Sequence, residues 1–216
     1  MFREWLGQML AREPGFVVCG EADNIQQGLR LIEQTSPDIA IVDITLRGSS
    51  GLELIKDLKA LGLNVPVLVL SMHDEALYAE RVLRAGAKGY ISKSEASSTL
   101  TDAIEQVLAG KVYLGEKMTA LMLEKITHPR GAGATSRMDL LADRELEVFQ
   151  LVGRGYNGRE IAEQLHLGET TIDTYRARIK EKLQLRNAAD LYSRALAPPS
   201  FRRPQVSRAW SGAGRR

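Results

Sequence analysis

The stretch REIAEQLHLGETTIDTYRARIKEKL, residues 159–183, predicts two helices joined by a tight turn, and it decides the fold of the carboxyl-terminal part of the chain. Apolar residues recur at helical spacing on one side of each half, namely Ile161, Ala162 and Leu165, then Ile172, Tyr175, Ile179 and Leu183. Gly168 gives the turn a permissive backbone. The polar residues from Glu169 to Thr171 stand where a helix start favours capping oxygens and negative charge.

The second helix has an outward face that suits a DNA groove. When Ile172 points inward, the residues that point outward are Thr170, Thr174, Ala177 and Glu181, flanked by Asp173 and Arg178, with Arg176, Lys180 and Lys182 along the borders. Small and polar side chains on such a face meet base edges, while the bordering cations reach phosphates. An ordinary amphipathic helix with a solvated charged face is the alternative, and the flanking sequence decides between them.

That flanking sequence resembles the LuxR-type helix-turn-helix domain. The motifs are LADRELEV (141–148), Gly153, NGREIA (157–162), TIDTYRARI (171–179) and KLQLRN (182–187), and the resemblance runs from about Leu140 to Leu196. It implies contact with double-stranded DNA, which we assign to Thr170, Thr171, Asp173, Thr174, Tyr175, Ala177, Arg178, Lys180 and Lys182. Ala142 replaces the usual capping Thr, so we expect Asp143 to take over the cap. Asp173 stands where many members carry Lys, and an acid there would accept a hydrogen bond from a cytosine amine.

Composition indicates a globular chain with charge placed unevenly. The 216 residues are 44% hydrophobic and 26% charged, which suits one or two domains. Residues 1–136 hold 14 Lys+Arg against 17 Asp+Glu, whereas residues 137–216 hold 15 against 10. The net charges of −3 and +5 favour nucleic-acid contact by the second part. A single cysteine, Cys19, and the lack of long apolar runs fit a cytoplasmic protein without membrane segments.

The first part of the chain alternates helical and strand patterns. We expect helices over 2–11, 24–34, 51–61, 74–85 and 95–109, and strands over 16–20, 39–43, 65–70 and 89–91. Such alternation predicts an α/β domain with a parallel sheet covered on both faces. In these sheets chemistry gathers at the carboxyl ends of the strands.

Three expected strand ends carry chemically useful side chains: Asp43, Ser71 and Lys93. Each alone is an ordinary turn or surface residue. Together on one rim they supply a carboxylate nucleophile, a hydroxyl donor and a fixed cation, which suits acceptance of a phosphoryl group.

This constellation resembles the receiver domain of two-component response regulators of the NarL/FixJ class. The motifs are PDIAIVD (37–43), GLEL (51–54), VLVLS (67–71) and AGAKGYISK (85–93). The resemblance implies that Asp43 is the phosphoacceptor, that Ser71 and Lys93 contact the phosphoryl group, and that Tyr90 is the aromatic switch. It also implies Mg²⁺ in an intact receiver, held by Asp43 and the carbonyl of Thr45. Arg47 replaces the proline usual after the acceptor.

The start of the chain departs from the receiver pattern. It opens at Met1-Phe2-Arg3-Glu4, inside what resembles the first helix, so we expect the first strand and its acidic pair to be missing. Asp43 alone is a weak Mg²⁺ site, because hard cations need several oxygens. The resemblance implies an α/β flavodoxin-like strand order, in which the missing first strand is central, so its absence would leave the 39–43 strand with an unpaired edge. We hypothesise that Met1 is an internal methionine of a longer reading frame, and the rival is a shortened, phosphorylation-independent regulator.

The predicted domains are a receiver-like domain over 1–111, a linker with a short helix over 112–138, the helix-turn-helix domain over 139–197 and a disordered basic tail over 198–216. We expect a non-enzymatic transcriptional regulator, phosphorylated on Asp43 in a full-length form, with a sensor histidine kinase as partner and a homodimer when active. Two alternatives stay open. One is a decoy that acts through receiver dimerisation, and the other is a phosphatase-like enzyme, disfavoured because Thr45 stands where a second acid would be needed.

Overall fold

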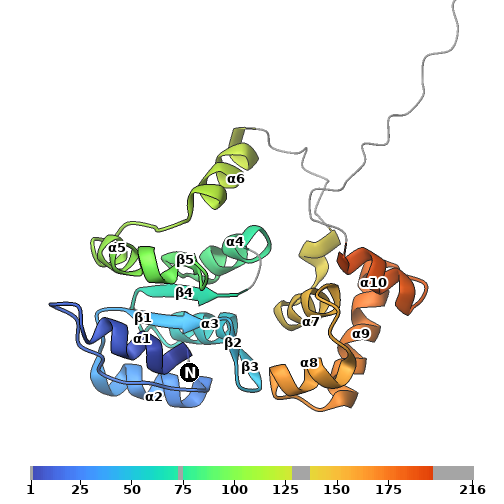
Figure 1. Ribbon diagram of the computed structural model, residues 1–216, viewed down its shortest axis with the longest axis horizontal. Coiled ribbons are helices and arrows are strands. Elements are labelled where there is room, and N and C mark those ends of the chain that lie inside the picture. The colour runs from blue at the N-terminus through green and yellow to red at the C-terminus, as the bar shows by residue number, and fades with distance from the viewer. Residues whose placement is uncertain (1, 73–74, 128–136, 197–216) are drawn as a thin grey trace, which may run out of the picture.

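The computed structural model describes residues 2–72, 75–127 and 137–196 (Figure 1). The expected tail over 198–216 and residues 128–136 of the expected linker lie outside the described residues. The first domain alternates helices and strands. Its elements are α1 (Phe2–Leu10), α2 (Ile25–Thr35), β1 (Ala40–Asp43), β2 (Thr45–Leu46), β3 (Ser49–Ser50), α3 (Gly51–Ala60), β4 (Val67–Ser71), α4 (Glu75–Ala85), β5 (Gly89–Ser92) and α5 (Ala96–Leu108).

The described sheet is parallel, in the order β1-β4-β5, as the apolar strand patterns predict. Successive residues of β4 point to opposite faces. Val67 and Val69 pack toward α3 and α4, whereas Leu68 and Leu70 pack toward α1 and α5. The sheet is therefore covered on both faces, which confirms the predicted α/β class.

Local sequence explains where the helices begin. Asn24 caps α2 by accepting a hydrogen bond from the Gln27 amide at 3.0 Å. Ser50 and Glu53 form a reciprocal capping box at α3, since the Ser50 hydroxyl accepts from the helix backbone and the Glu53 carboxylate accepts from the Ser50 amide. These caps fix α3 directly behind the loop that follows β1.

The expected strand over 16–20 does not form. These residues have no assigned strand, and the Val17 side chain is 88% exposed. Among the described strands β1 pairs with β4 alone, so no neighbour offers residues 16–20 a ladder of backbone hydrogen bonds. The structure also contains a short β2–β3 hairpin that the sequence patterns did not predict.

The edge strand β5 pairs with the segment that follows α5. Tyr113 forms a parallel bridge with Gly89, donating to the Lys88 carbonyl at 2.9 Å and accepting from the Tyr90 amide at 3.1 Å. A Cβ on Gly89 would lie 3.0 Å from the Tyr113 carbonyl oxygen, so glycine permits this approach. Helix α6 (Glu116–Thr127) follows and contacts α4.

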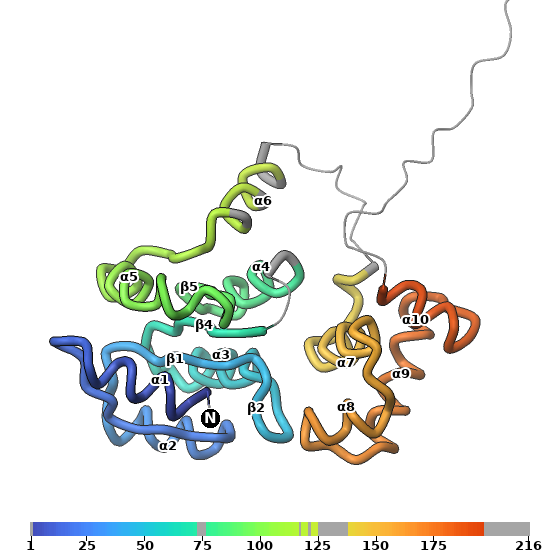
Figure 2. The backbone as a smooth tube through the Cα atoms, in the orientation of Figure 1, coloured from blue at the N-terminus to red at the C-terminus, as the bar shows by residue number. Residues whose placement is uncertain are grey.

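The second domain is helical, as the backbone trace in Figure 2 makes plain. A 3₁₀ turn, η1 (Arg137–Leu140), precedes α7 (Asp143–Gly153), α8 (Gly158–Leu165), α9 (Glu169–Leu183) and α10 (Ala188–Leu196). Helix α7 packs against α9 and α10, and α8 packs against α9. In the described residues, no helix combines the length and apolar character that a membrane span requires.

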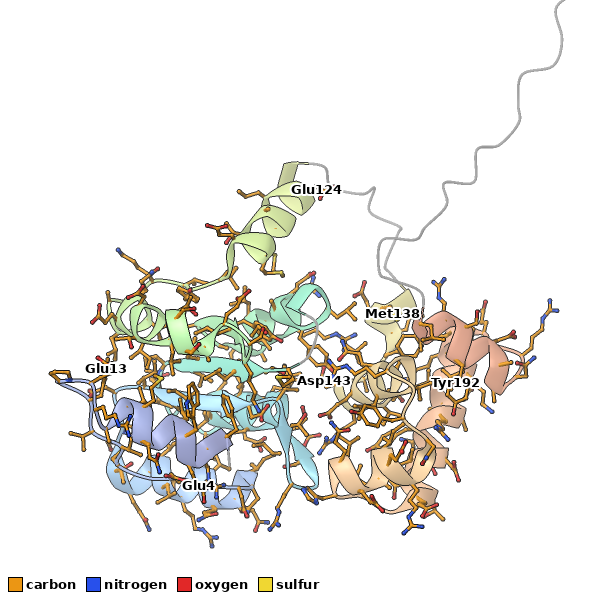
Figure 3. The ribbon with its side chains drawn as sticks, viewed as in Figure 1. Glu4, Glu13, Glu124, Met138, Asp143 and Tyr192 are labelled. Atoms are coloured by element: carbon orange, nitrogen blue, oxygen red, sulfur yellow. The ribbon has the colours of Figure 1, made fainter. Side chains whose placement is uncertain are left out.

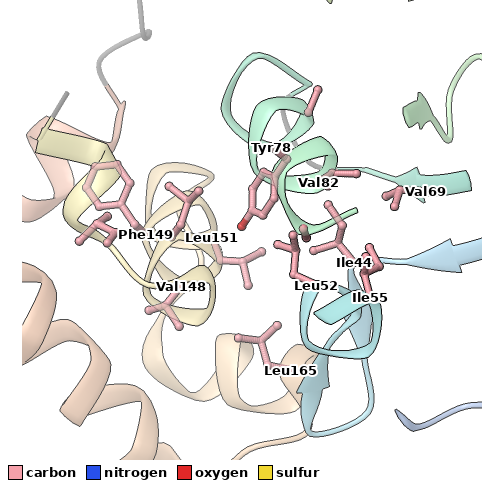
Figure 4. Close-up of a cluster of buried hydrophobic side chains, with 14 of the residues drawn as sticks. Ile44, Leu52, Ile55, Val69, Tyr78, Val82, Val148, Phe149, Leu151 and Leu165 are labelled. Atoms are coloured by element: carbon pink, nitrogen blue, oxygen red, sulfur yellow. The ribbon is translucent and has the colours of Figure 1, made fainter. Parts of the chain in front are cut away.

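The two domains share one apolar cluster. Leu52 of α3 and Tyr78 of α4 lie in the same cluster as Val148 and Leu151 of α7 (Figure 4). Helix α7 lies between the sheet domain and α9 (Figures 1 and 3). The domains are therefore docked through α7 rather than merely joined by the linker.

Candidate functional site

The structure brings Asp43 and Lys93 together at the carboxyl ends of the strands. The Lys93 ammonium forms an ion pair with Asp43 Oδ2, and the Thr45 amide donates to Asp43 Oδ1 at 3.2 Å. The Asp43 side chain is 30% exposed, so it remains reachable from solvent. Lys93 also lies 4.5 Å from the centre of the Phe2 ring, which holds the ammonium from a second side.

Ser71 completes the rim from the middle strand. Its side chain is fully buried at the end of β4, opposite Ser92 in the parallel register, and its carbonyl accepts from the Lys93 amide at 2.9 Å. Tyr90 is fully buried and packs with the residues on the α3 and α4 face. The predicted acceptor, hydroxyl and cation therefore lie on adjacent strand ends, and Tyr90 lies inside the domain.

The close approach of α3 to Asp43 requires glycine at position 51, and the sequence patterns did not reveal this requirement. A Cβ at this position would lie 2.0 Å from the Asp43 carbonyl oxygen, which no side chain can tolerate. The Gly51 amide also donates to the Ile44 carbonyl at 2.6 Å. The start of α3 thus lies directly against the backbone of the candidate acceptor.

The described residues at this rim do not fit a divalent cation. In the part of the chain that the structure describes, no group of three or more His, Cys, Asp or Glu side chains could hold a metal. Asp43 has an ammonium rather than a second carboxylate beside it. Hard cations require several oxygen ligands, and this donor set does not supply them.

The helix pair at residues 158–183 forms as predicted. Asn157 and Glu160 make a capping box at α8, and His166 ends α8 in the left-handed region with φ 53°. Gly168 is the N-cap residue of α9, whose Ile172, Ile179 and Leu183 are buried. The inward faces of both helices are thus fixed in the domain core, and the opposite face of α9 is left to solvent.

The predicted DNA-contact residues differ in how far they are exposed. Those on the outward face are exposed, namely Thr170, Asp173, Thr174, Ala177 and Arg178. Thr171, Tyr175 and Lys180 are half-buried, and Tyr175 packs against the core. Lys182 is exposed in part, but its ammonium lies 2.7 Å from Glu145 Oε2.

The start of α7 differs from the expectation for Asp143. Asp143 does not cap the helix; it is the first residue of α7, and its carboxylate pairs with Lys56 at 2.6 Å and Arg81 at 3.2 Å. Glu145 instead caps the start of α7, because its carboxylate accepts a hydrogen bond from the Ala142 amide at 2.8 Å. A carboxylate at the first position of a helix points away from its own capping amides, so it is free to pair with another element.

The domain interface contains polar contacts that no sequence pattern predicted. Arg144 and Glu147 form a buried ion pair on α7, and Glu147 Oε1 accepts from the Thr45 hydroxyl at 2.7 Å. Arg81 donates to the Leu141 and Met138 carbonyls at 2.7 Å. The i,i+3 spacing of Arg144 and Glu147 indicates that they can pair on one face of a helix. It does not indicate that Glu147 contacts Thr45 of the first domain.

Tyr78 lies at the centre of this interface. Burial raises the pKa of its hydroxyl well above the 10.0 of a free tyrosine, and the negative charge of Glu147 raises the pKa further, whereas Arg81 lowers it. The group is therefore neutral throughout the physiological range, consistent with a side chain that is fully buried between α3, α4 and α7.

The chain thus combines an α/β domain, with Asp43 and Lys93 paired at its strand ends, and a helical domain that leaves the outward face of α9 exposed. Residues 1–105 match the response regulator receiver domain, and residues 139–195 match the bacterial regulatory proteins of the luxR family. A chain from Pseudomonas aeruginosa is 38% identical over 184 residues, covering 85% of this chain and 87% of the relative. The transcriptional activator protein ExaE of Pseudomonas putida is 33% identical over 196 residues and covers 91% of each chain.

Solved structures agree with these relatives. A LuxR-family two-component response regulator from Aurantimonas has 31% identity and a TM-score of 0.55, covering 58% of this chain and 90% of the other. The RcsB structure from Salmonella enterica bound to promoter rprA has 22% identity and a TM-score of 0.57, covering 90% and 93%, and shows the same fold. The chain belongs to the two-component response regulators with a LuxR-type DNA-binding domain, and it is a transcriptional regulator.

Proposed function

We propose that this regulator is controlled at Asp43 and binds DNA through the outward face of α9. The observation that carries the first part is the Asp43–Lys93 ion pair, which joins residues fifty positions apart, one at the carboxyl end of β1 and one just after β5, across the end of β4. Lys93 holds a positive charge where a phosphoryl group would add negative charge. Ser71 offers a hydroxyl at the neighbouring strand end, and Tyr90 changes its packing with the state of the site.

The DNA contacts follow from the exposure of α9. Thr170, Asp173 and Thr174 face the bases, Arg178 contacts a phosphate, and Ala177 allows close approach. Thr171, Tyr175 and Lys180 border this face and contact the DNA backbone. The ion pair of Lys182 with Glu145 positions α9, so Lys182 supports the interface as well as adding positive charge beside it.

Membership of the family supports the remaining assignments. The domains are the receiver over 1–111, the linker over 112–138, the DNA-binding domain over 139–197 and the basic tail over 198–216. The protein acts in the cytoplasm, receives its phosphoryl group from a sensor histidine kinase and pairs as a homodimer on double-stranded DNA. It acts through binding rather than as an enzyme on a substrate of its own. Mg²⁺ is the cofactor that the receiver family implies, and the described residues alone do not form its site.

A second function is favoured by two observations. Asp43 is already neutralised by Lys93, and α9 keeps its outward face exposed while the domains are docked. Regulation through protein contact, without phosphorylation, agrees with both facts. The two functions differ in whether phosphorylation of Asp43 changes the affinity for DNA.

The test is DNA binding by the purified chain to a pool of genomic fragments at low and moderate salt. We expect enrichment of a short recurrent sequence, with affinity that falls as salt rises. Asp43→Asn should abolish phosphorylation by a small phosphoryl donor; an aspartyl-phosphate that persists in this variant rules out Asp43 as acceptor. Enrichment of no sequence would refute DNA recognition by α9.

A further inference from the structure

Three neighbouring side chains on the outward face of α9 have very little capacity to donate hydrogen bonds. Asp173, Thr174 and Ala177 are all exposed, and residues three and four apart on a helix are neighbours, so these side chains border one another. The Asp173 carboxylate only accepts hydrogen bonds, and Ala177 ends in a methyl group. Whether this part of the face can donate to a base therefore depends on the hydroxyl of Thr174.

The hydroxyl of Thr174 donates within its own helix. Its Oγ1 donates to the carbonyl of Thr170, one turn earlier, at 2.9 Å. Threonine readily makes this bond in helices, because its hydroxyl reaches the preceding turn. A hydroxyl has one proton, so the oxygen can still accept a hydrogen bond but cannot donate a second one. The methyl group leaves the same Cβ in another direction and takes no part in this bond. Thr174 therefore presents a methyl group to a ligand.

The chemistry of the major groove decides which base fits this surface. Guanine shows two acceptors there, cytosine an amine, adenine an acceptor and an amine, and thymine an acceptor and a methyl group. The guanine acceptors require a donor, which Asp173, Thr174 and Ala177 do not supply. Thymine is the base with an apolar group in this groove, and the methyl groups of Thr174 and Ala177 match it. The nearest charged donor is Arg178, one turn after Thr174, which we assign to a phosphate.

We propose that Thr174 is a specificity residue that recognises thymine through its methyl group, with Ala177 beside it, and that the Thr174 hydroxyl does not contact a base. The inference rests on the proposed binding of DNA by α9. The competing interpretation is that Thr174 is small and only allows the helix to approach the groove. The two interpretations differ in one respect: recognition makes the affinity depend jointly on a methyl group of the protein and a methyl group of the DNA.

The test is a double-mutant cycle between these two methyl groups. The full chain first selects its preferred sequence from a pool of duplexes. Each thymine of that sequence is then replaced singly by deoxyuridine, which lacks only the C5 methyl group. The affinities of the unaltered chain and of Thr174→Ser are measured for each duplex at one salt concentration. Serine keeps a hydroxyl that can make the same bond to the Thr170 carbonyl and removes only the methyl group.

At one thymine or more, we expect deoxyuridine to lower the affinity of the unaltered chain about fourfold, as the loss of one buried methyl group should. Thr174→Ser should bind the same two duplexes with affinities that agree within about 1.5-fold, because the partner methyl group is gone. Thr174→Val removes the hydroxyl and keeps a methyl group. It should select the same sequence as the unaltered chain and bind it within about twofold.

Thr119→Ser is the matched control. Thr119 is exposed on α6, and its hydroxyl likewise donates to the carbonyl four residues earlier, that of Gly115, at 3.1 Å. The substitution therefore makes the same chemical change on a helix outside the DNA-binding domain. This variant should keep the full sensitivity of the unaltered chain to deoxyuridine.

Equal sensitivity of the unaltered chain and Thr174→Ser at every thymine would overturn the proposal. So would a loss of about tenfold or more in the affinity of Thr174→Val, because the hydroxyl would then contact a base. Failure of the proposed function has a different outcome: no sequence is enriched, and the proposal falls with DNA recognition by α9. An enriched sequence in which no thymine is coupled to position 174 overturns only the recognition of thymine by Thr174.

Discussion

Helices α7 and α9 belong to the same small domain, and both carry many charged residues, yet they use charge in opposite ways. On α7, Arg144, Glu145 and Glu147 are at most 6% exposed. On α9, Asp173 and Arg178 lie at the surface, and its buried residues are Ile172, Ile179 and Leu183. The buried charges of α7 have partners that hold the two domains and α9 in place, whereas the exposed charges of α9 remain available to a ligand.

The largest expected effect is the loss of the buried charge on α7. Glu147→Ala leaves the Arg144 guanidinium buried without its ion pair, and we expect a loss of about 3–5 kcal/mol in the free energy of unfolding. Urea denaturation of the full chain measures it. Glu181→Ala on the exposed side of α9 should change the free energy of unfolding by less than about 0.5 kcal/mol.

Apolar replacement of the whole pair sharpens this prediction. The double variant with Arg144→Met and Glu147→Leu removes both charges, and we expect it to recover most of the stability lost in Glu147→Ala. If Glu147→Ala and Glu181→Ala cost the same, the contrast between the two helices is wrong.

A smaller effect separates two cations of α9. Lys182→Ala leaves Glu145, whose side chain is 3% exposed, without its ammonium partner. We expect a loss of about 1–3 kcal/mol in the free energy of unfolding. Arg178→Ala should leave stability nearly unchanged, weaken DNA binding and reduce the slope of log affinity against log salt by about 1. Denaturation and salt titration of both variants decide the matter, and an unchanged salt slope in Arg178→Ala would remove that residue from the phosphate contacts.

The pH dependence of the interface gives a third measurement. The pKa of Tyr78 is raised in the folded chain, so the folded state retains a proton that the unfolded state begins to release near pH 10. Stability that Tyr78 contributes is therefore fully present below pH 10 and is lost as the pH rises toward the folded pKa. We expect a decline of at most about 1.4 kcal/mol per pH unit from this group. In Tyr78→Phe that part of the alkaline decline should vanish; a decline of the same slope would mean that Tyr78 is not its source.

The smallest effect is expected at the edge of the interface. Lys56 pairs with Asp143 but is 57% exposed, whereas Arg81 pairs with the same carboxylate and is 18% exposed. We expect Lys56→Ala to cost less than about 1 kcal/mol of stability, as exposed ion pairs do. Arg81→Ala should cost more, because it also removes donors from the Leu141 and Met138 carbonyls. A larger loss in Lys56→Ala than in Arg81→Ala would reverse this ranking.

Local patterns predicted much of the molecule. The periodicity of Ile172, Ile179 and Leu183 placed the inward face of α9, and the apolar run ending at Asp43 placed β1. The strand order of an α/β sheet then predicted that Asp43, Ser71 and Lys93 share a rim, and the ion pair between Asp43 and Lys93 agrees with that prediction. These features depend on spacing along the chain or on a topology that few residues determine.

The failures have a common cause. Residues 16–20 carry a strand pattern, but a strand needs a neighbour, and the described sheet gives them none. Asp143 was assigned to a local cap, yet its carboxylate pairs with Arg81, a residue far away in the sequence. A charged side chain does not reveal its partner, because a surface contact and a buried ion pair require the same residue types.

The amino-acid sequence by itself determined the two domain classes, the inward faces of their helices and the candidate acceptor, since hydrophobic periodicity and strand-end position are local properties. Only the tertiary structure decided that α7 lies on the loops beside Asp43 and that its charges hold the domains together. Docking depends on shape and on pairs such as Thr45 with Glu147, separated by about a hundred residues, and no local pattern encodes a contact over that distance.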